Sequence, residues 1–387
     1  MFRIGQEEID AVAKVIQARK FFKINDGPQE CKHFQEEMCE LLGAKYSIFM
    51  TSGHAALSSA LIALGIGPGD EVIVPAYTYI ATAMAVIAAG AMPVVAEVDE
   101  TLTLDAADVE KRITPRTKAI VPVHIQGFPS DMDALMAVAQ KYNLYVVEDA
   151  CQADGGSYKG KRLGTIGHAG GYSFNYYKVI SCGEGGALVT NDKALHDKAL
   201  IYHDSNAVAF FGDQLADVDV PPFCGSEYRG NEILAAIMRV QLKRMDGILE
   251  DNRANKKKLM EALADTFTFA PSHDIEGDCA TTVALRFETE AEARRVQEIA
   301  GGTIPYDTGK HVYINWQAFI DQRGALHPAM DPFKMEANKD HVPSYGPEQC
   351  PKSLDLLART LYIGIHPDMT DEEIQTIAAK YKAAMNA

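Results

Sequence analysis

Apolar residues in the first 250 positions fall into short runs separated by longer amphipathic segments. The runs hold four or five residues, are rich in Val, Ile and Ala, and are bounded by turn residues, which is typical of strands buried on both faces. The segments between them have the length and spacing of helices. We therefore expect an α/β fold with a mostly parallel central sheet flanked by helices. The expected strands are residues 46–50, 71–74, 93–97, 119–123, 144–148, 171–174 and 187–190, preceded by a helix at 30–42.

A long segment without any charged residue lies between positions 72 and 96. Pro75, Gly90 and Pro93 interrupt it, and it is rich in Ala and Thr rather than in Leu and Phe. These features predict a buried strand, a helix and a second strand rather than a membrane span.

The pattern changes after a helix expected at 241–252. A lysine-rich stretch at 255–258 leads into a region with expected helices at 291–299 and 371–385. A chain of 387 residues is long for one compact domain. We expect a large domain over residues 1–250, which includes an N-terminal helix, and a smaller C-terminal α+β domain over residues 251–387.

Composition narrows the class of protein. The formal charge is 37 − 53 = −16, which argues against a nucleic-acid surface because phosphate binding needs clustered Lys and Arg. The seven cysteines are scattered and contain no C-x-x-C pair, so we expect reduced thiols, with neither a disulfide framework nor a metal site. The N-terminus carries charges where a signal peptide needs apolar residues. A cytoplasmic enzyme without membrane contact is the expectation.

Two residues with chemical potential follow expected strands. Asp149 comes directly after an apolar run, at the carboxyl end of a strand, where open α/β sheets bind ligands. Lys178 lies in a loop after the strand that ends near Ser173, and a lysine in such a crevice is a competent Schiff-base nucleophile. Alone, such an aspartate is more often a helix cap, and such a lysine is usually solvated. Their combination is what indicates a cofactor site.

Three motifs carry a family resemblance: E-D-A-C-Q-A-D-G at 148–155, S-F-N-Y-Y-K at 173–178 and G-E-G-G at 183–186. Together they resemble the DegT/DnrJ/EryC1/StrS family of sugar aminotransferases, which are fold-type I enzymes that use pyridoxal 5′-phosphate. The resemblance extends from residues 27–28 to 241–242 and, more loosely, to 369–373. It implies a homodimer in which each active site is shared between two subunits.

The resemblance assigns roles to single residues. Lys178 would hold the cofactor as a Schiff base and carry the proton during transfer, and Asp149 would pair with the pyridine nitrogen. Gln152 would approach the ring hydroxyl, Ser173 would bind the phosphate, and Tyr79 would stack on the ring unless it is a core aromatic. The phosphate would also sit at the start of the helix that follows residues 51–52, on the backbone of Gly53, His54 and Ala55.

The chain departs from the family at two positions. His54 stands where a threonine is usual. Backbone N–H donors for the phosphate remain there, and a protonated imidazole would be one way for the side chain to help bind it. Glu227 stands where an asparagine normally reaches the neighbouring subunit's phosphate, and a carboxylate there is repulsive. One possibility is that the Glu227 side chain turns away from the phosphate and that Arg229 or Ser226 compensates for the unfavourable carboxylate. The other is that His54 and Glu227 pair across the dimer interface.

The resemblance also places a substrate pocket around Tyr306, His311 and Trp316, since aromatic and polar side chains together suit a sugar. For Trp316, a place in the core of the smaller domain is equally compatible with the sequence.

The implied reaction is ping-pong transamination from L-glutamate or L-glutamine to a keto or aldehydo sugar, which is nucleotide-linked, a sugar acid or a cyclitol. One alternative is a sugar dehydratase or another lyase on the same fold, but those relatives replace the lysine with histidine. The other is a non-catalytic regulatory protein that binds the cofactor, which would not need the complete set of Asp149, Gln152, Ser173 and Lys178.

Overall fold

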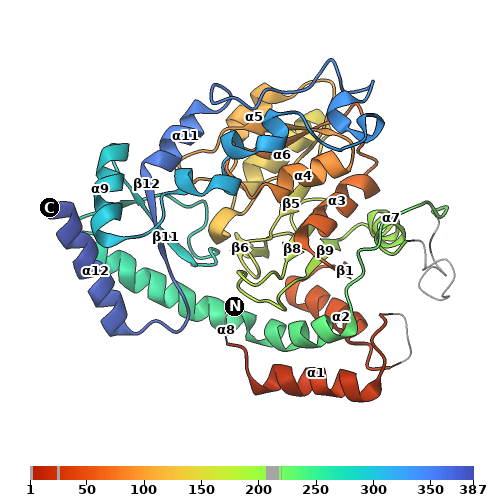
Figure 1. The fold of residues 1–387 in the computed structure, drawn as a ribbon. Coiled ribbons are helices and arrows are strands. Elements are labelled where there is room, and N and C mark those ends of the chain that lie inside the picture. The colour runs from red at the N-terminus through yellow and green to blue at the C-terminus, as the bar shows by residue number, and fades with distance from the viewer. Residues whose placement is uncertain (1–2, 24–26, 206–217, 219) are drawn as a thin grey trace.

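The structure of the chain is a computed structural model that describes residues 3–23, 27–205, 218 and 220–387 (Figure 1). A seven-stranded sheet with the order β1-β9-β8-β5-β4-β2-β3 forms its centre. All of its pairings are parallel except those that β9 makes with β1 and β8. The strands are β1 (Tyr46–Met50), β2 (Glu71–Pro75), β3 (Met92–Ala96), β4 (Thr117–Ile120), β5 (Tyr145–Asp149), β8 (Ala169–Ser173) and β9 (Gly186–Thr190).

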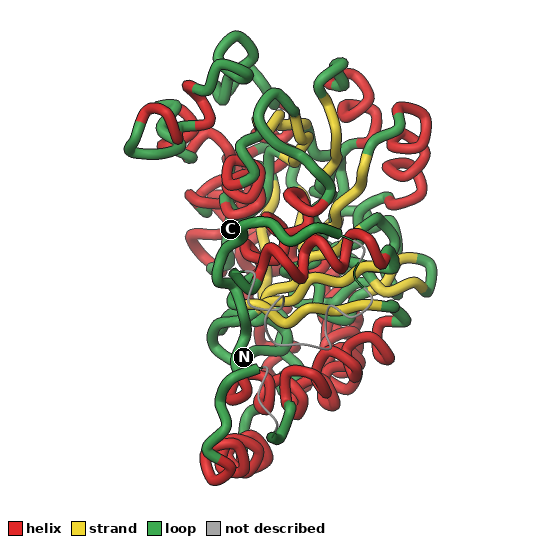
Figure 2. Tube along the Cα trace, turned by 90° about the vertical axis from the view of Figure 1, so that its right-hand side faces the viewer, coloured by secondary structure: helices red, strands yellow, loops and turns green. Residues whose placement is uncertain are grey.

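Helices cover both faces of this sheet, as Figure 2 shows in a view turned by 90°. One face packs against α2, α5, α6 and α8, and the other packs against α3, α4 and α7, each with its own cluster of buried apolar side chains. Burial of both faces explains why the strands are continuous apolar runs. The bounds are α2 (Glu30–Leu42), α3 (Gly53–Ala63), α4 (Ala81–Ala88), α5 (Ala106–Arg112), α6 (Met132–Tyr142), α7 (Lys193–His203) and α8 (Glu232–Leu263), with α1 (Gln6–Ala18) lying on α8.

The expected α/β architecture is confirmed, including the uncharged segment, which forms β2, α4 and β3. In the described part of the chain, no helix is both long enough and apolar enough to cross a bilayer. The short hairpin of β6 (Ser157–Tyr158) and β7 (Lys161–Arg162) lies outside the central sheet.

The C-terminal part contains a three-stranded antiparallel sheet with a separate apolar core. Its elements are β10 (Thr268–Phe269), β11 (Thr282–Arg286), α9 (Glu290–Ala300), α10 (Gln317–Ile320), α11 (Pro351–Ala358), β12 (Thr360–Gly364) and α12 (Asp371–Asn386). Helix α8 reaches into this core through Leu259 and Leu263. The helix is continuous through residue 250, and the division of the chain there stays a prediction.

Helix α8 has 32 residues, far more than the 241–252 expected from the sequence. At its C-terminal end, part of the difference arises because three polar residues are buried rather than solvated, although Lys257 and Lys258 remain exposed. Asn252 donates to the carbonyl of Cys279, Asn255 donates to that of His366 at 3.1 Å, and the Lys256 ammonium pairs with the Asp278 carboxylate. Polar residues with internal partners thus continue the helix beyond the end expected from the sequence.

Candidate active site

The predicted site residues converge at one edge of the sheet. Because β1, β2, β5 and β8 run in the same direction, their carboxyl ends meet there, and β9 enters at its amino end. Gly53 and His54 follow β1, Tyr79 follows β2, and Asp149 and Ser173 are the last residues of β5 and β8. An edge of this kind is where open α/β sheets bind ligands.

The Asp149 carboxylate is buried, with 5% of the residue exposed, and its orientation is fixed by two donors. The Thr82 hydroxyl donates to Oδ2 at 2.6 Å, and the backbone N–H of Cys151 donates to Oδ1 at 3.1 Å. The Thr82 hydroxyl also lies 2.7 Å from that of Thr78. A carboxylate held in this way can pair with a protonated ring nitrogen at the sheet edge.

Thr82 was missed by sequence reasoning. The available signal was weak: Thr78 and Thr82 are spaced by four residues and are among the few hydrogen-bonding side chains of the uncharged segment.

The amino end of α3 forms a cradle for an anion beside Ser173. The Ser52 hydroxyl caps the helix by accepting from Ala55 N–H at 3.1 Å, while the N–H groups of Gly53 and His54 have no acceptor within the helix. A Cβ at Gly53 would clash with the Cys151 sulfur and lie 3.0 Å from Ser173 Cβ. Only glycine therefore allows the helix end to approach Ser173 so closely. Two free amides, a hydroxyl and the positive helix end fit a phosphate.

The environment of His54 disfavours the charged form of its side chain. Its Nδ1 lies 3.4 Å from the carbonyl oxygen of Ala81, to which it can donate only if protonated there. Burial lowers the pKa of His54, so its imidazole is neutral at physiological pH. The amide of His54 remains the group that suits a phosphate, whereas a protonated side chain is disfavoured.

Lys178 lies in a turn after β8, where its N–H donates to the carbonyl of Asn175 at 3.0 Å. The side chain is half-buried. Because β8 ends at Ser173, this turn places Lys178 at the same edge of the sheet as Asp149. Gln152 is half-buried, and its Oε1 accepts from the N–H of Gln126 at 2.9 Å.

A segment from the C-terminal part joins the site by pairing with the residues after β2. Thr78 N–H donates to the carbonyl of His311 at 2.9 Å, and Ile80 N–H donates to that of Lys310 at 3.0 Å. The rings of Tyr79 and His311 lie 5.5 Å apart, and the Lys310 ammonium is 5.1 Å from the Tyr79 ring centre. Tyr79 is 40% exposed, so it is not a core aromatic. Burial lowers the pKa of His311 to about 4.

Trp316 takes neither of the two places that the sequence left open, because it is buried in the apolar cluster between the central sheet and α3, α4 and α7 rather than in the core of the smaller domain. It is fully buried, its indole N–H donates to the carbonyl of Lys310 at 3.1 Å, and its ring packs 5.4 Å from that of Phe319. Trp316 is thus a core residue that supports the segment carrying His311. Tyr306 is half-buried and packs against the core of the C-terminal part and against a second cluster that residues from both parts of the chain share, among them Tyr77.

Glu227 and Arg229 lie beside the end of β1, where Thr51 N–H donates to the carbonyl of Tyr228 at 2.9 Å. The Glu227 carboxylate is exposed and pairs with the Arg229 guanidinium of the same chain at 2.7 Å. Within one chain, Arg229 therefore compensates the charge of Glu227. A pair between Glu227 and His54 across two subunits stays a prediction.

Comparisons with known proteins find similar sequences and a similar solved structure. The model of the DegT/DnrJ/EryC1/StrS aminotransferase family matches residues 3–382. The chain is 32% identical over 402 positions to the spore coat polysaccharide biosynthesis protein SpsC of Bacillus subtilis (strain 168), covering 97% of this chain and 93% of the relative. It is 44% identical over 218 positions to GDP-perosamine synthase of Caulobacter vibrioides, covering 55% and 56%. The solved structure of an aminotransferase from Psychrobacter cryohalolentis superposes with a TM-score of 0.80 at 30% identity, covering 100% of this chain and 98% of that one.

Proposed function

The chain belongs to the DegT/DnrJ/EryC1/StrS aminotransferase family, and on that premise we propose that it transfers an amino group from L-glutamate or L-glutamine to a sugar carbonyl, using pyridoxal 5′-phosphate on Lys178. One observation carries this proposal: an oriented carboxylate, an anion cradle and a half-buried lysine share a single edge of the sheet. These are the three groups that the cofactor's ring nitrogen, phosphate and aldehyde require.

Different residues of the site would hold different parts of the cofactor. Asp149 would hold the ring nitrogen protonated, because its carboxylate is fixed by Thr82 and the Cys151 amide. Ser173 and the amides at the start of α3 would bind the phosphate. Gln152 would approach the ring hydroxyl, and the exposed ring of Tyr79 would stack on the cofactor.

Bound pyridoxal phosphate supplies an electron sink that lets the substrate carbon release its proton. The protein's part in the reaction is proton transfer and positioning. The Lys178 amine would remove the proton from the amino-bearing carbon of the donor and return it one atom away, acting first as a base and then as an acid. In the second half of the ping-pong cycle the same amine would act in the opposite direction on the sugar.

The acceptor would lie against Tyr79, His311 and Tyr306. An imidazole that stays neutral down to about pH 4 offers a hydrogen bond without charge, which suits a sugar hydroxyl. We propose a keto or aldehydo sugar as the acceptor class, whether nucleotide-linked, a sugar acid or a cyclitol. The similarity to GDP-perosamine synthase supports including nucleotide-linked sugars.

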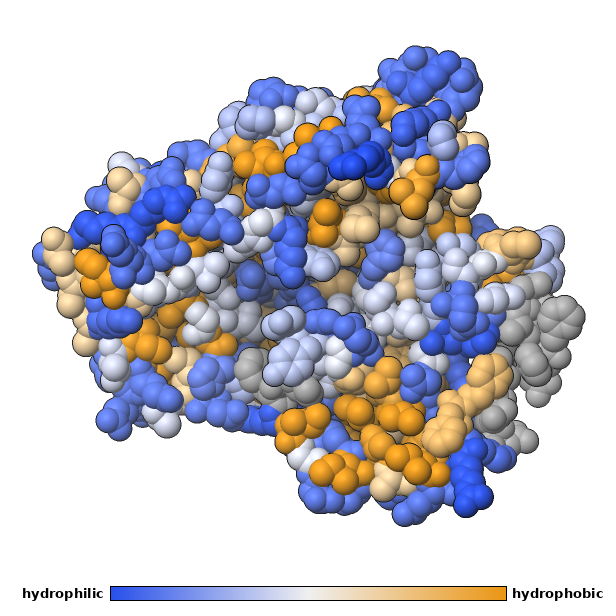
Figure 3. All heavy atoms as spheres, in the orientation of Figure 1, coloured by the Kyte–Doolittle hydropathy of each residue, from blue (hydrophilic) through white to orange (hydrophobic). Residues whose placement is uncertain are grey.

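A second copy of the chain is the proposed partner. Large apolar side chains on and beside α1 are exposed, and Figure 3 shows apolar surface gathered over this helix. Ile9 is 61% exposed, and Ile4 and Ile16 are each 52% exposed. An apolar patch of this kind marks an interaction surface. A homodimer would cover it and bring the Glu227 segment of one subunit to the site of the other.

The test is to load the protein with pyridoxal phosphate, reduce it with borohydride and locate the added mass. We expect the mass on Lys178 and none in Lys178→Ala. The loaded enzyme should lose its yellow absorbance with glutamate or glutamine and regain it when an oxo-sugar is added. Label on another lysine would refute the site. Release of water rather than formation of an amino sugar would indicate a lyase, and no response to either donor would indicate a regulatory protein.

A further inference from the structure

Gln126 has a backbone conformation that is unusual for a residue with a side chain. It lies in the short helical turn Ile125–Gly127, between β4 and α6, and its φ is +54°. Residues with a Cβ disfavour this left-handed region. The turn begins at the edge of the sheet that carries the site, where the N–H of His124 donates to the carbonyl of Asp149 at 3.1 Å. A strained residue beside a site must be held by its surroundings and commonly has a role there.

Three hydrogen bonds to two distant parts of the chain hold Gln126 in this conformation. Its backbone N–H donates to Oε1 of Gln152 at 2.9 Å. Its backbone carbonyl accepts from the Thr281 hydroxyl at 2.8 Å, and its side-chain Oε1 accepts from the Thr282 hydroxyl at 3.2 Å. Gln152 is one of the predicted cofactor residues, whereas Thr281 and Thr282 lie at the start of β11 in the C-terminal part.

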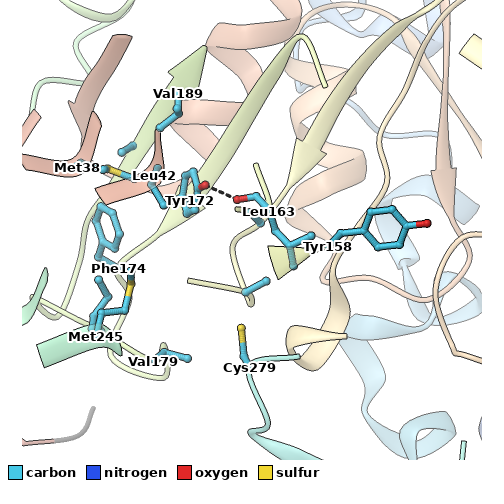
Figure 4. Packing of buried hydrophobic residues seen from close by; sticks show 14 of the residues in the cluster. Met38, Leu42, Tyr158, Leu163, Tyr172, Phe174, Val179, Val189, Met245 and Cys279 are labelled. Carbon is cyan, nitrogen blue, oxygen red and sulfur yellow. Dashed lines mark hydrogen bonds between the residues drawn. The ribbon is translucent and has the colours of Figure 1, made fainter. Parts of the chain in front are cut away.

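The C-terminal segment that meets this turn is itself fixed. The N–H of Cys279 donates to the carbonyl of Gly127 at 3.2 Å, and a Cβ at Gly127 would lie 2.5 Å from Cys279 Cβ. Cys279 is fully buried in the apolar cluster on one face of the central sheet, and Figure 4 shows it together with Leu163 and Tyr172 of that cluster. The contacts that hold Gln126 therefore come from a packed part of the molecule.

The hydrogen bond from Gln126 fixes the orientation of the Gln152 amide. A backbone N–H can donate only to the oxygen of a side-chain amide, so Oε1 of Gln152 faces the turn. The Nε2 group, which carries two donors, has no hydrogen-bond partner in the part of the chain that the structure describes. It remains available to the site. A donor at this place suits the ring oxygen of the cofactor when that oxygen is ionised.

We propose that Gln126 is a positioning residue that acts through Gln152, holding its Nε2 group as a donor toward the ring oxygen of the cofactor. Such a donor stabilises negative charge on that oxygen, which then attracts the proton of the neighbouring Schiff-base nitrogen less. Loss of the donor should therefore raise the pKa of that nitrogen. This role rests on the proposed function, but the hydrogen bond between the two glutamines is a property of the cofactor-free chain.

Two substitutions separate the backbone conformation of Gln126 from its side chain. Gln126→Gly and Gln126→Val both lose the contact with Thr282. Glycine adopts a positive φ easily and keeps the N–H in place, whereas a β-branched residue strongly disfavours it and should move the N–H away from Gln152. In the cofactor-loaded protein, Gln126→Val should raise the pH midpoint of the yellow absorbance by about one unit, and Gln126→Gly should leave it unchanged.

A second variant distinguishes positioning from a general disturbance of the fold. Gln152→Leu should raise the midpoint as much as Gln126→Val does, and combining the two substitutions should raise it no further. A midpoint that is the same in Gln126→Val and wild type would overturn the proposal. So would an additional shift in the double variant. If Gln126→Val does not fold, Gln126→Ala serves the same comparison, because alanine also disfavours the left-handed conformation.

Hydrogen exchange resolved to single residues tests the pairing without the cofactor. The amide of Gln126 should exchange about tenfold faster in cofactor-free Gln152→Leu than in wild type, because its acceptor is gone. The amide of Gly127 is the matched control, since it donates to the carbonyl of His124 within the same turn and should keep its rate. An unchanged rate at Gln126 would contradict the pairing. Failure of the proposed function would differ, because wild type would then hold no cofactor on Lys178 while the exchange result would stand.

Discussion

The close approach of α3 to Ser173 can be tested by adding a single methyl group. In Gly53→Ala the new Cβ would lie 3.0 Å from Ser173 Cβ and 3.3 Å from the Tyr172 carbonyl oxygen, and closer still to the Cys151 sulfur. Two of these neighbours belong to β8 and cannot easily move, because that strand is paired on both sides. The amino end of α3 must therefore shift away from Ser173.

The expected loss follows from this crowding. Forcing an additional methyl group into a packed interior lowers the free energy of unfolding by about 1–3 kcal/mol. Gly53 is the first residue of α3, so little of the gain of about 1 kcal/mol for replacing glycine in a helix interior is returned, and a net loss of about 1–3 kcal/mol is expected. The anion cradle should also widen, and inorganic phosphate should then stabilise the variant less than it stabilises wild type.

Guanidinium unfolding of the cofactor-free protein, with and without phosphate, measures both effects. Gly247→Ala is the matched control, since Gly247 lies in α8 with open space around its Cβ position and should gain about 0.5–1 kcal/mol. Adding Cys151→Ala removes the nearest clashing atom and should restore part of the loss, which a double-mutant cycle detects as coupling. Equal stability and equal phosphate response of Gly53→Ala and wild type would refute the geometry.

Three further predictions concern neighbouring side chains. Thr82→Val should lower the free energy of unfolding by about 1.5–3 kcal/mol, because the charged Asp149 loses its 2.6 Å donor, whereas Thr82→Ser should stay close to wild type in denaturant unfolding. Because burial holds the pKa of His311 at about 4, against 6.5 ordinarily, the unfolded chain binds the proton first, and stability should fall between about pH 6.5 and pH 4 by up to about 3 kcal/mol. That loss should be absent from His311→Asn in unfolding measured across the same pH range. Glu227→Asn should release the cofactor faster in dialysis if Glu227 pairs with His54 of a second subunit, and unchanged retention would remove that idea.

Much of the fold could be predicted because the sequence patterns that specify it are local. The helix at Glu30–Leu42 and the strand at Tyr46–Met50 have the bounds expected from the sequence. Gly43, with φ of +69°, ends the helix in the left-handed conformation that glycine adopts easily. The position of Asp149 at the end of a strand was likewise visible, because an apolar run ends there.

Other features depend on contacts that no local pattern carries. The 32 residues of α8 could not be expected, since Asn252 and Asn255 look solvated until their partners far along the chain are known. The burial of Asp154 is also a tertiary property, because its backbone carbonyl accepts from the thiol of Cys279, which lies far along the chain. For Trp316, composition alone supported a pocket and a core equally.

The continuity of α8 has a consequence for protein engineering. At 1.5 Å per residue its 32 residues form a rod about 48 Å long that begins beside the sheet edge and ends in the C-terminal core. A chimaera that takes its C-terminal part from a relative should be joined after Leu263. A junction near residue 250 would build one continuous helix from two different parent sequences. The donated part must still offer carbonyl groups to Asn252 and Asn255.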